Sequence, residues 1–325
     1  MVTQKETARK LGVSRQLLTL ALRGYAQVSK ESRERIVATA AAMGYRPNPH
    51  ALALKTGRTG VVALWIPEMI STYYLGLAGV MNRLVKQHHY DLLISEVGGS
   101  EAKTALESFP VDAVFVVDAP ALARMHSKRV PVISMGALCH EPADYVKVDL
   151  FAGTVEAMQH LLARGFRRIV HMTYERTDAR HSDRRRGYLK TIREAGLKPE
   201  FIYYDATDQQ RAVARQLVQD YIHAQGRPEA IFCHSDDVAI GVYRGLCDLG
   251  VRVPADVALV GCDGIQDTEY LECPITTLVQ PVEEMCAAAW QLFQQPADGS
   301  RRKPQRIVLK PRFAVRASTS RNTTT

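Results

Sequence analysis

The chain has 325 residues, of which 46% are hydrophobic and 23% are charged, and its formal net charge is +8. This composition is typical of a globular protein that buries a large core. It contains no apolar run of membrane-spanning length and no signal peptide before the first predicted helix, so we expect a cytoplasmic protein. The six cysteines are scattered without a metal-ligand spacing, which favours buried or idle thiols and predicts neither a metal nor a cofactor.

The excess of positive charge lies entirely in the first sixth of the chain. Residues 1–58 contain 11 lysines and arginines and 3 acidic residues, and the remaining chain contains 31 of each sign. Because neutralisation of phosphates drives non-specific binding to nucleic acids, this distribution favours a polyanionic partner. A solvated basic surface would explain the charge alone, but not its coincidence with the helical motif in the same residues.

Residues 4–24 predict two short helices joined by a turn. The first buries Ala8 and ends before Gly12, and Ser14 is a suitable N-cap for the second. The unburied front of the second helix carries Arg15, Gln16 and Thr19. This is the layout of a helix-turn-helix, whose second helix enters the DNA major groove, where Arg pairs with guanine and Gln with adenine. A generic helical hairpin is the alternative, and the local charge favours DNA binding.

A third helix is predicted over residues 30–43, with Ser29 as its N-cap, and would complete a three-helix core. Pro47 and Pro49 then break any continuous helix, and the residues that follow are too few to form a stable one alone. We therefore expect a linker or hinge over residues 47–59.

The remaining chain alternates predicted strands and helices. Its apolar runs favour strands over residues 61–66, 90–96, 112–117, 130–135, 145–149, 167–172, 201–205, 230–234 and 257–263. The predicted helices span residues 74–88, 101–108, 154–164, 185–195, 209–225 and 238–249. Such alternation indicates parallel sheets covered on both faces. The length and a restart near residue 165 favour two doubly wound α/β subdomains, with a ligand cleft at the carboxyl ends of the strands.

Several sequence blocks, taken together, resemble the LacI (lactose-repressor) family of bacterial transcriptional regulators. They include KETARKLGVSRQLLTLALRG, VSKESRERIVATAAAMGYRPN, GRTGVVALWIP, AIFCHSDDVAIGVYRGLCDLGVRVPADVALVGCDG and PITTLVQPVEEM, in the family's order. The resemblance implies an all-α helix-turn-helix headpiece and an effector domain like periplasmic binding proteins, made of two doubly wound parallel-sheet subdomains. The implied domains are 1–46 (DNA binding), 47–59 (hinge), 60–318 (effector binding and dimerisation) and 319–325 (disordered tail). Within the effector domain it assigns about 60–160 and 283–300 to the N-subdomain, and about 161–281 and 301–318 to the C-subdomain.

The resemblance also implies a ligand-responsive repressor that binds a palindromic operator as a homodimer or a dimer of dimers. A small polar metabolite, such as a sugar, would modulate its affinity for DNA. The positions that match DNA contacts are Ser14, Arg15, Gln16, Thr19, Arg23, Ser32, Ala51 and Leu54. Leu54 would wedge a base step from the minor groove, with a core position as the alternative. Leu20, Arg23 and Leu52-Ala53 depart from the residues common in the family, so the operator is expected to differ from the usual consensus.

The positions that match effector contacts are Tyr74, Asp149, Arg184, Ser235, Asp236, Asp263 and Gln280. An Arg fork and Asp263 together could clamp vicinal hydroxyls or a carboxylate. Helix capping is the alternative for Asp149, where we favour it, and for Asp236. Arg184 stands in an arginine-rich run, where a solvated side chain is the alternative.

Two further features bear on the effector and the assembly. Arg176, Arg180 and His181 add positive charge near the predicted cleft and allow an acidic or phosphorylated effector. The segment over residues 98–110 is shorter than is usual in the family, which could alter the dimer face.

Two other classes of protein compete with this interpretation. A cytoplasmic or exported small-molecule (sugar) binding protein would share the effector domain, but it would not need the basic N-terminal segment. An enzyme is not expected, because the sequence contains no glycine-rich nucleotide motif, no G-x-S-x-G and no metal cluster. The neighbouring carboxylates Asp236 and Asp237 at a predicted helix start are more typical of a cap and a solvated residue.

Overall fold

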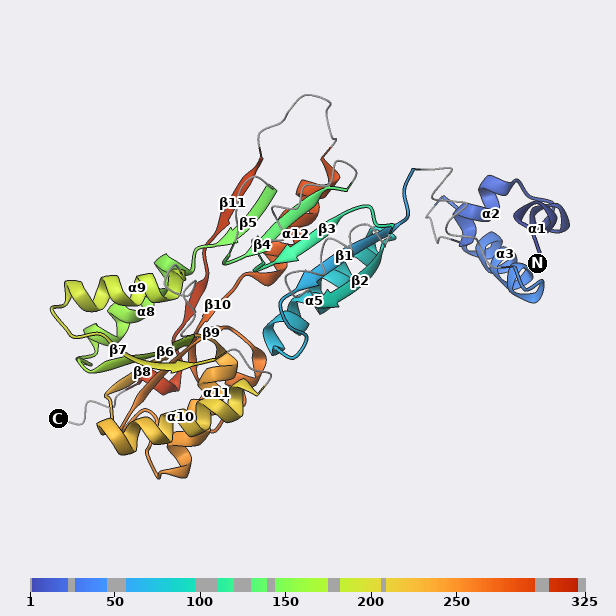
Figure 1. The fold of residues 1–325 in the computed structure, drawn as a ribbon. Coiled ribbons are helices and arrows are strands. Elements are labelled where there is room, and N and C mark those ends of the chain that lie inside the picture. The colour runs from blue at the N-terminus through green and yellow to red at the C-terminus, as the bar shows by residue number, and fades with distance from the viewer. Residues whose placement is uncertain are drawn as a thin grey trace.

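The structure is a computed structural model of the chain. It describes residues 2–22, 27–45, 57–96, 110–119, 130–138, 144–174, 182–205, 209–295 and 304–320. Figure 1 shows three N-terminal helices that stand apart from a larger body containing two β-sheets. The predicted fold class, a helical headpiece followed by two parallel-sheet units with flanking helices, is confirmed. Among the described residues, no helix has both the length and the apolar character needed to cross a membrane.

The headpiece consists of three helices, α1 (Gln4–Leu11), α2 (Arg15–Leu22) and α3 (Lys30–Ala42). At the start of α1, Thr3 and Glu6 form a capping box, in which each side chain accepts a hydrogen bond from the other's backbone N–H. Gly12 adopts a φ of 64° after α1, a conformation that is open to glycine at little cost. The helices bury a small apolar core of Ala8, Leu18, Ala21, Val28 and Ile36.

The first sheet has six parallel strands in the order β11-β5-β4-β3-β1-β2. They are β1 (Val61–Ile66), β2 (Asp91–Glu96), β3 (Val114–Val117), β4 (Val132–Gly136), β5 (Asp144–Val148) and β11 (Arg306–Leu309). Two helices, α5 (Thr72–Gln87) and α12 (Val282–Gln294), pack against this sheet and against each other. Trp290 of α12 stacks beside Phe115 of β3 and joins the helix to the sheet. We call this sheet and its helices the first unit.

The second sheet has the order β12-β10-β9-β8-β6-β7, and all its strands are parallel except β12, which runs antiparallel to β10. They are β6 (Ile169–Tyr174), β7 (Glu200–Tyr204), β8 (Ala230–Cys233), β9 (Ala258–Asp263), β10 (Thr276–Val279) and β12 (Arg312–Ala314). The helices α8 (Leu150–Ala163) and α9 (Asp183–Glu194) pack as a pair on one side of this sheet, and α10 (Gln210–Gln225) and α11 (Asp236–Asp248) on the other (Figure 1). The second pair packs closely because Gly241 lacks a side chain: a Cβ there would lie 2.2 Å from the Arg211 carbonyl oxygen. This is the second unit.

The chain crosses between the two units at points that differ from the predicted subdomain limits. β11 falls within residues 301–318, assigned to the C-subdomain, but it pairs with β5 in the first sheet. Most of α8 falls within residues 60–160, assigned to the N-subdomain, but this helix packs against α9 of the second unit. The crossings therefore occur before α8, before α12, and between β11 and β12. The hydropathy pattern also did not predict β10, α12, β11 or β12.

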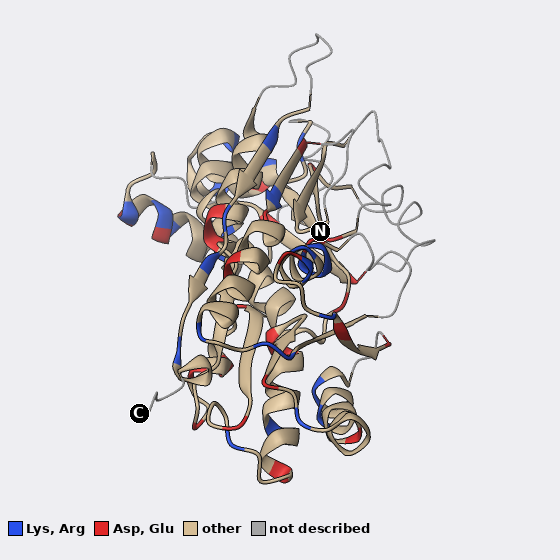
Figure 2. Ribbon diagram, turned by 90° about the vertical axis from the view of Figure 1, so that its left-hand side faces the viewer, with Lys and Arg blue, Asp and Glu red and all other residues tan. Residues whose placement is uncertain are grey.

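Acidic and basic residues are interspersed along the ribbon of the body (Figure 2). This mixture agrees with the balanced charge of residues 59–325. The predicted helix over residues 101–108 and most of the shortened segment 98–110 lie outside the described residues. The predicted disordered tail, residues 319–325, starts too early, because Thr319 ends a 3₁₀ helix over Ala317–Thr319 and is buried, with its hydroxyl 2.9 Å from that of Thr276. Residues 321–325 lie outside the described residues.

Candidate DNA-binding and effector sites

The front of α2 presents two of the predicted base-contacting side chains to solvent. Ser14 caps the helix, since its Oγ accepts a hydrogen bond of 3.0 Å from the Leu17 backbone N–H. Arg15 and Gln16 follow in the first turn, and both are exposed. An Arg and a Gln at this place in a helix-turn-helix can reach base edges in the major groove.

Thr19, also predicted to contact DNA, is engaged within the headpiece. Its hydroxyl donates to the Arg15 carbonyl oxygen at 2.9 Å and accepts a hydrogen bond of 2.7 Å from the Gln4 side-chain amide. The Gln4 amide also donates to the Arg15 carbonyl oxygen at 3.2 Å. These bonds connect α1 to α2, so the visible role of Thr19 is to hold the recognition helix in place.

Of the other predicted DNA contacts, only Ser32 lies among the residues that the structure describes. Ser32 is half-buried in the first turn of α3, and its backbone N–H donates to the Ser29 hydroxyl at 3.3 Å. Arg23, Ala51 and Leu54 lie outside the described residues. Leu20 packs against the apolar core of the headpiece, which gives this departure from the family pattern a structural use.

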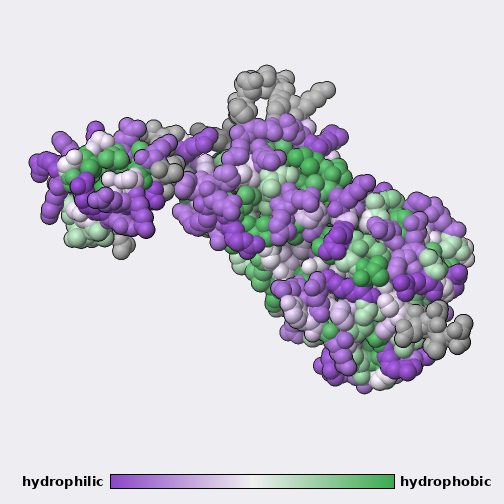
Figure 3. Space-filling model, turned by 180° about the vertical axis from the view of Figure 1, so that it is seen from behind, coloured by the Kyte–Doolittle hydropathy of each residue, from purple (hydrophilic) through white to green (hydrophobic). Residues whose placement is uncertain are grey.

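The headpiece presents its positive charge at the surface. Six of its described lysines and arginines are exposed, namely Lys5, Arg9, Lys10, Arg15, Lys30 and Arg35. In Figure 3 the surface of the headpiece is mostly hydrophilic. Exposed cations of this kind can neutralise phosphates along a duplex.

A second set of predicted residues meets where β9 and β10 end. The Arg184 side chain, on α9, is 13% exposed, and its Nη2 lies 3.4 Å from Oδ1 of Asp263. The same oxygen accepts a hydrogen bond of 2.8 Å from the Gln280 side-chain amide. Arg184 also donates through Nε to the Cys262 sulfur at 3.3 Å. Burial raises the pKa of Asp263 to about 7, although Arg184 opposes the change.

The first unit contributes a second set of polar side chains, from α5 and from the end of β3. The Tyr74 hydroxyl donates to Oδ2 of Asp118 at 3.1 Å, and the Leu138 backbone N–H donates to Oδ1 of Asp118 at 2.8 Å. Burial raises the pKa of Asp118, and these donors and Arg184 oppose that rise. The neighbouring Tyr73 is buried, and its hydroxyl has no hydrogen-bond partner among the described residues.

The groups from the two units act on one another electrostatically. Arg184 lowers the pKa values of Asp118 and Tyr73, while Asp118 and Asp263 raise that of Tyr73. Cys262, Asp263 and Asp118 in turn hold the pKa of Arg184 above its ordinary value, against the effect of burial. Charges from both sheets therefore face a common place at the carboxyl ends of the strands. We call this set the polar cluster: Tyr73, Tyr74, Asp118, Arg184, Asp263 and Gln280.

Aromatic rings at the ends of three strands of the second sheet extend the cluster. Tyr174 ends β6, Tyr204 ends β7 and His234 follows β8. The Tyr174 ring centroid lies 4.5 Å from that of Tyr204 and 4.7 Å from that of His234. Burial holds the pKa of His234 well below its ordinary value, which keeps the ring neutral at neutral pH. These aromatic rings could pack against an uncharged or ring-shaped part of a ligand.

The other predicted effector residues have structural roles in the described chain. Asp149 caps α8, because its Oδ1 accepts a hydrogen bond of 3.0 Å from the Ala152 N–H, as the capping interpretation predicts. Ser235, rather than Asp236, caps α11, through a hydrogen bond of 3.3 Å from the Val238 N–H.

Asp236 is fully buried and points inward, under the turn that follows β9. It accepts hydrogen bonds from the backbone N–H groups of Gly264 at 2.7 Å and Ile265 at 2.9 Å, and from the Thr277 hydroxyl at 2.7 Å. Burial raises its pKa to about 6. Asp236 thus holds the turn that follows Asp263, whose own φ is 122°. In this way it helps to position the Asp263 carboxyl group in the cluster.

Direct hydrogen bonds between the two units lie beside the cluster. The Gln210 amide donates to Glu68 Oε1 at 2.9 Å. Thr72 donates through its backbone N–H and its hydroxyl to the Asp237 carboxylate, each at 3.2 Å. Arg211 donates to the Thr72 hydroxyl at 3.1 Å. In this structure these bonds join the two units directly.

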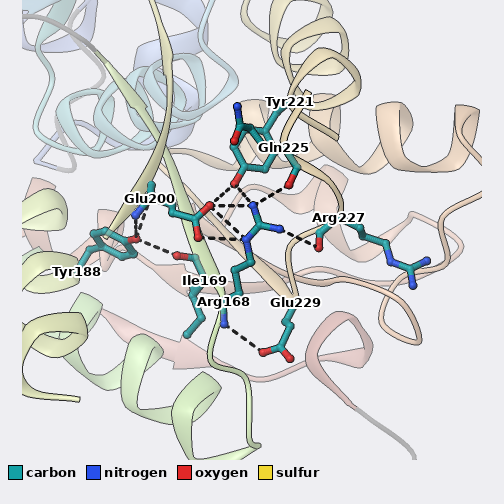
Figure 4. A network of polar contacts seen from close by, with 8 residues as sticks. All are labelled: Arg168, Ile169, Tyr188, Glu200, Tyr221, Gln225, Arg227 and Glu229. Carbon is teal, nitrogen blue, oxygen red and sulfur yellow. Dashed lines mark hydrogen bonds and ion pairs between the residues drawn. The ribbon is translucent and has the colours of Figure 1, made fainter. Parts of the chain in front are cut away.

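A second polar network lies at the amino ends of the strands of the second sheet (Figure 4). Arg168, just before β6, binds the Glu200 carboxylate through Nε and Nη2 at 3.0–3.2 Å and donates to the Tyr221 hydroxyl at 3.0 Å. Arg168 holds the pKa of Glu200 below its ordinary value. The polar cluster lies at the carboxyl ends of the same parallel strands, so this network is remote from it. The network joins the strands to α10.

Comparison with known proteins finds similarity to a domain family in the body and to transcriptional regulators over the whole chain. A family model described as a periplasmic binding protein-like domain matches residues 158–319. The chain is 26% identical over 330 residues to the ribose operon repressor of Haemophilus influenzae, covering 98% of both chains. It is 25% identical to the HTH-type transcriptional regulator DegA of Bacillus subtilis, covering 97% of each, and 25% identical to the repressor PurR of Escherichia coli, covering 98% of this chain and 97% of that one. The chain is thus similar over nearly its whole length to transcriptional regulators.

Solved structures of transcriptional regulators resemble this chain in fold over the headpiece and the body. The transcriptional regulator CelR, in its cellobiose complex, is 26% identical, with a TM-score of 0.67 over 98% of this chain and all of that one. A LacI-family regulator from Sanguibacter keddieii is 27% identical, with a TM-score of 0.70 over 81% of this chain and all of that one. The lac repressor dimer bound to operator is 21% identical and shares the fold, with a TM-score of 0.74 over 98% of this chain and 99% of that one. The names of these relatives are those of regulators and not of enzymes.

The sequence did not single out Asp118 or the aromatic side chains of Tyr174, Tyr204 and His234. Asp118 follows the apolar strand β3 as Asp263 ends β9, so the same end-of-strand signal was available for it. Arg176, Arg180 and His181, which suggested an acidic effector, lie outside the described residues. No group of three or more potential metal ligands occurs in the part of the chain that the structure describes.

Proposed function

We propose that this protein is a cytoplasmic transcriptional repressor that binds a palindromic operator as a homodimer and responds to a small polar metabolite. The observation that carries the proposal is one combination. A helix-turn-helix with exposed Arg15 and Gln16 stands on a basic headpiece, and a separate body holds a buried polar cluster between two sheets. The proposal contains no catalytic step.

The DNA-binding half of the proposal follows from charge and geometry. Two copies of α2, related by a two-fold axis, would enter successive major grooves one helical turn apart. Exposed cations around α1 and α3 would neutralise phosphates, and Arg15 and Gln16 would contact base edges. Residues 47–59, including Ala51 and Leu54, would supply the minor-groove contact. The lac repressor, a structural neighbour, has been solved on its operator.

The effector half follows from the position of the polar cluster. Groups from both units meet there, so a ligand bound between them would favour one relative placement of the units over others. That placement would determine the spacing of the two headpieces and hence the affinity for DNA. Because this coupling is a free energy shared by both sites, operator binding must alter effector affinity by the same factor. Structural neighbours have been solved with cellobiose, ribose and lactose.

Selection of duplexes from a random library by the purified full-length chain would test the proposal. We expect a two-fold symmetric motif and a saturable complex whose affinity falls steeply as salt rises. Leu54→Ala should weaken operator binding and leave effector affinity nearly unchanged. Asp263→Asn should weaken effector binding and leave operator affinity nearly unchanged. A chain that selects no motif and shows no salt-sensitive complex would be a small-molecule binding protein without DNA function, and the proposal would fail.

A further inference from the structure

We propose that Asp118 makes the polar cluster select an uncharged, hydroxyl-bearing effector and exclude phosphorylated or carboxylated ones. The inference rests on the proposed function only in taking the polar cluster as the effector site. Three observations support it, and they concern charge, fixed geometry and the unmatched hydrogen-bonding groups of the cluster.

The first observation is that the positive charge of Arg184 is already compensated from both units. Asp263 lies 3.4 Å away in the second unit, and Asp118 approaches from the first unit closely enough for each group to shift the other's pKa. An incoming anion would gain one guanidinium but would also approach two carboxyl groups. Buried like charges repel strongly because little solvent screens them. The described cluster therefore offers an anion no net attraction.

The second observation is that Asp118 is held in place. Its two oxygens accept hydrogen bonds from the Leu138 N–H and the Tyr74 hydroxyl, at 2.8 and 3.1 Å. The carboxylate lies over Gly136, where a Cβ would be only 2.5 Å from its Oδ1. The space that a side chain of β4 would fill is thus occupied by Asp118. A carboxylate fixed in this way cannot turn aside to admit a phosphate.

The third observation concerns which hydrogen-bonding groups of the cluster lack partners. The Tyr73 hydroxyl and the Gln280 Oε1 are both buried and have no partner among the described residues. Tyr73 offers a proton, whereas Gln280 Oε1 only accepts one. A ligand hydroxyl both donates and accepts, so a polyol can satisfy the two groups together. The ionised group of a carboxylate or of a phosphate monoester dianion only accepts hydrogen bonds and would leave Gln280 Oε1 unmatched, which is costly for a buried atom.

Binding of inorganic phosphate by the full-length protein tests this inference without knowledge of the effector. Melting temperatures would be measured at pH 7 and constant ionic strength while phosphate replaces chloride. Wild type is compared with Asp118→Asn, with Arg184→Gln and with the double variant Asp118→Asn/Arg184→Gln. Asp118→Asn keeps the shape of the side chain and removes its charge. Asp91→Asn, an exposed aspartate of the same unit, controls for the change in net charge.

We expect phosphate to raise the melting temperature of Asp118→Asn by about 2 °C or more beyond that of wild type. The double variant should lose this rise, because Arg184 would be the anion's partner, and Asp91→Asn should match wild type. Phosphate bound by the basic headpiece would shift all variants alike and cancels in the comparison.

Two results would overturn the inference. One is a phosphate-dependent rise in wild type that Arg184→Gln abolishes, since the site would then accept anions with Asp118 present. The other is the absence of a gain in Asp118→Asn and in Asp118→Ser, the second variant used if the first is poorly folded. Neither result depends on DNA, so failure here and failure to select an operator are distinguishable.

Discussion

Charged side chains of the headpiece lie mainly at its surface, whereas three charged side chains of the body are largely buried in its polar cluster. Lys5, Arg9 and Lys10 on α1 are exposed and add to a positive surface. In the body, Arg184 is almost enclosed with Asp118 and Asp263, and the surrounding charges are mixed. Exposed charges act over the screening length of the solution and contribute little to folding, but buried ones must be paired and are costly to disturb. The same residue types therefore serve DNA binding in one region, and stability and ligand choice in the other.

Removal of the buried cation should have the largest effect on folding. Arg184→Ala leaves Asp263 and Asp118 without their compensating charge, and we expect the free energy of unfolding to fall by about 3–5 kcal/mol. Urea denaturation followed by circular dichroism measures the change. Arg186→Ala, on the same helix but with its side chain 55% exposed, is the matched control and should cost less than about 1 kcal/mol. Equal losses in the two variants would contradict the contrast between enclosed and exposed charge.

The next effect concerns the pH dependence of stability. The pKa of Asp263 is about 7 in the folded protein, above its value in an unfolded chain, so the folded state binds more protons between about pH 4 and pH 7. The unfolding free energy of wild type should therefore fall as pH rises through this window, relative to Asp263→Asn, by roughly 1.4 kcal/mol per pH unit at most.

A useful contrast for this measurement is Asp256, whose pKa is held low by Arg252. Its contribution is present at neutral pH and is lost in acid, so Asp256→Asn should flatten the acid side of the profile. Parallel profiles for wild type and Asp263→Asn across pH 4–7 would show that Asp263 is not enclosed as described. Both variants can be followed by urea titration at each pH.

The sequence predicted those features that depend on neighbouring residues. The caps at Ser14 and Ser29, the turn at Gly12 and the exposed Arg15 are all determined within a few residues of each other, and local rules suffice for them. The apolar strands of both sheets were likewise evident as continuous runs. β11 was missed because it is short and its alternate residues are only partly buried, so it resembles a loop until β5 pairs with it.

The cluster was only partly predictable, because its geometry depends on distant segments. Asp263 and Gln280 end adjacent strands, and their positions indicated a site. Asp118 acquires its role only when Gly136 and Leu138 of the neighbouring strand region come beside it, 18 and 20 residues later. Asp236 stands at a helix start and resembles a cap, yet two donors from the turn after β9 and one from β10 hold it inward. No local rule distinguishes these outcomes.

In the headpiece, a smaller effect should separate base recognition from general DNA binding. Arg15→Ala removes an exposed side chain without a structural role in the headpiece, so its folding should be unchanged within about 0.5 kcal/mol. Discrimination at one base pair of each operator half-site should fall by roughly 1–3 kcal/mol. Fluorescence anisotropy with single-base operator variants measures it. A uniform loss across all variants would place Arg15 on the phosphate backbone instead.

The smallest expected effect comes from Thr19, whose hydroxyl joins α1 to α2. Thr19→Val removes its bonds to the Arg15 carbonyl oxygen and the Gln4 amide, and should destabilise the headpiece by about 0.5–1.5 kcal/mol. Because α2 would then be less firmly held, affinity should fall equally for all operator variants, with an unchanged dependence on salt. Thr19→Ser keeps the hydroxyl and should behave like wild type. If Thr19→Val instead lost discrimination at a single base pair, Thr19 would contact that base, and a residue that bonds within its own headpiece would also serve the DNA surface.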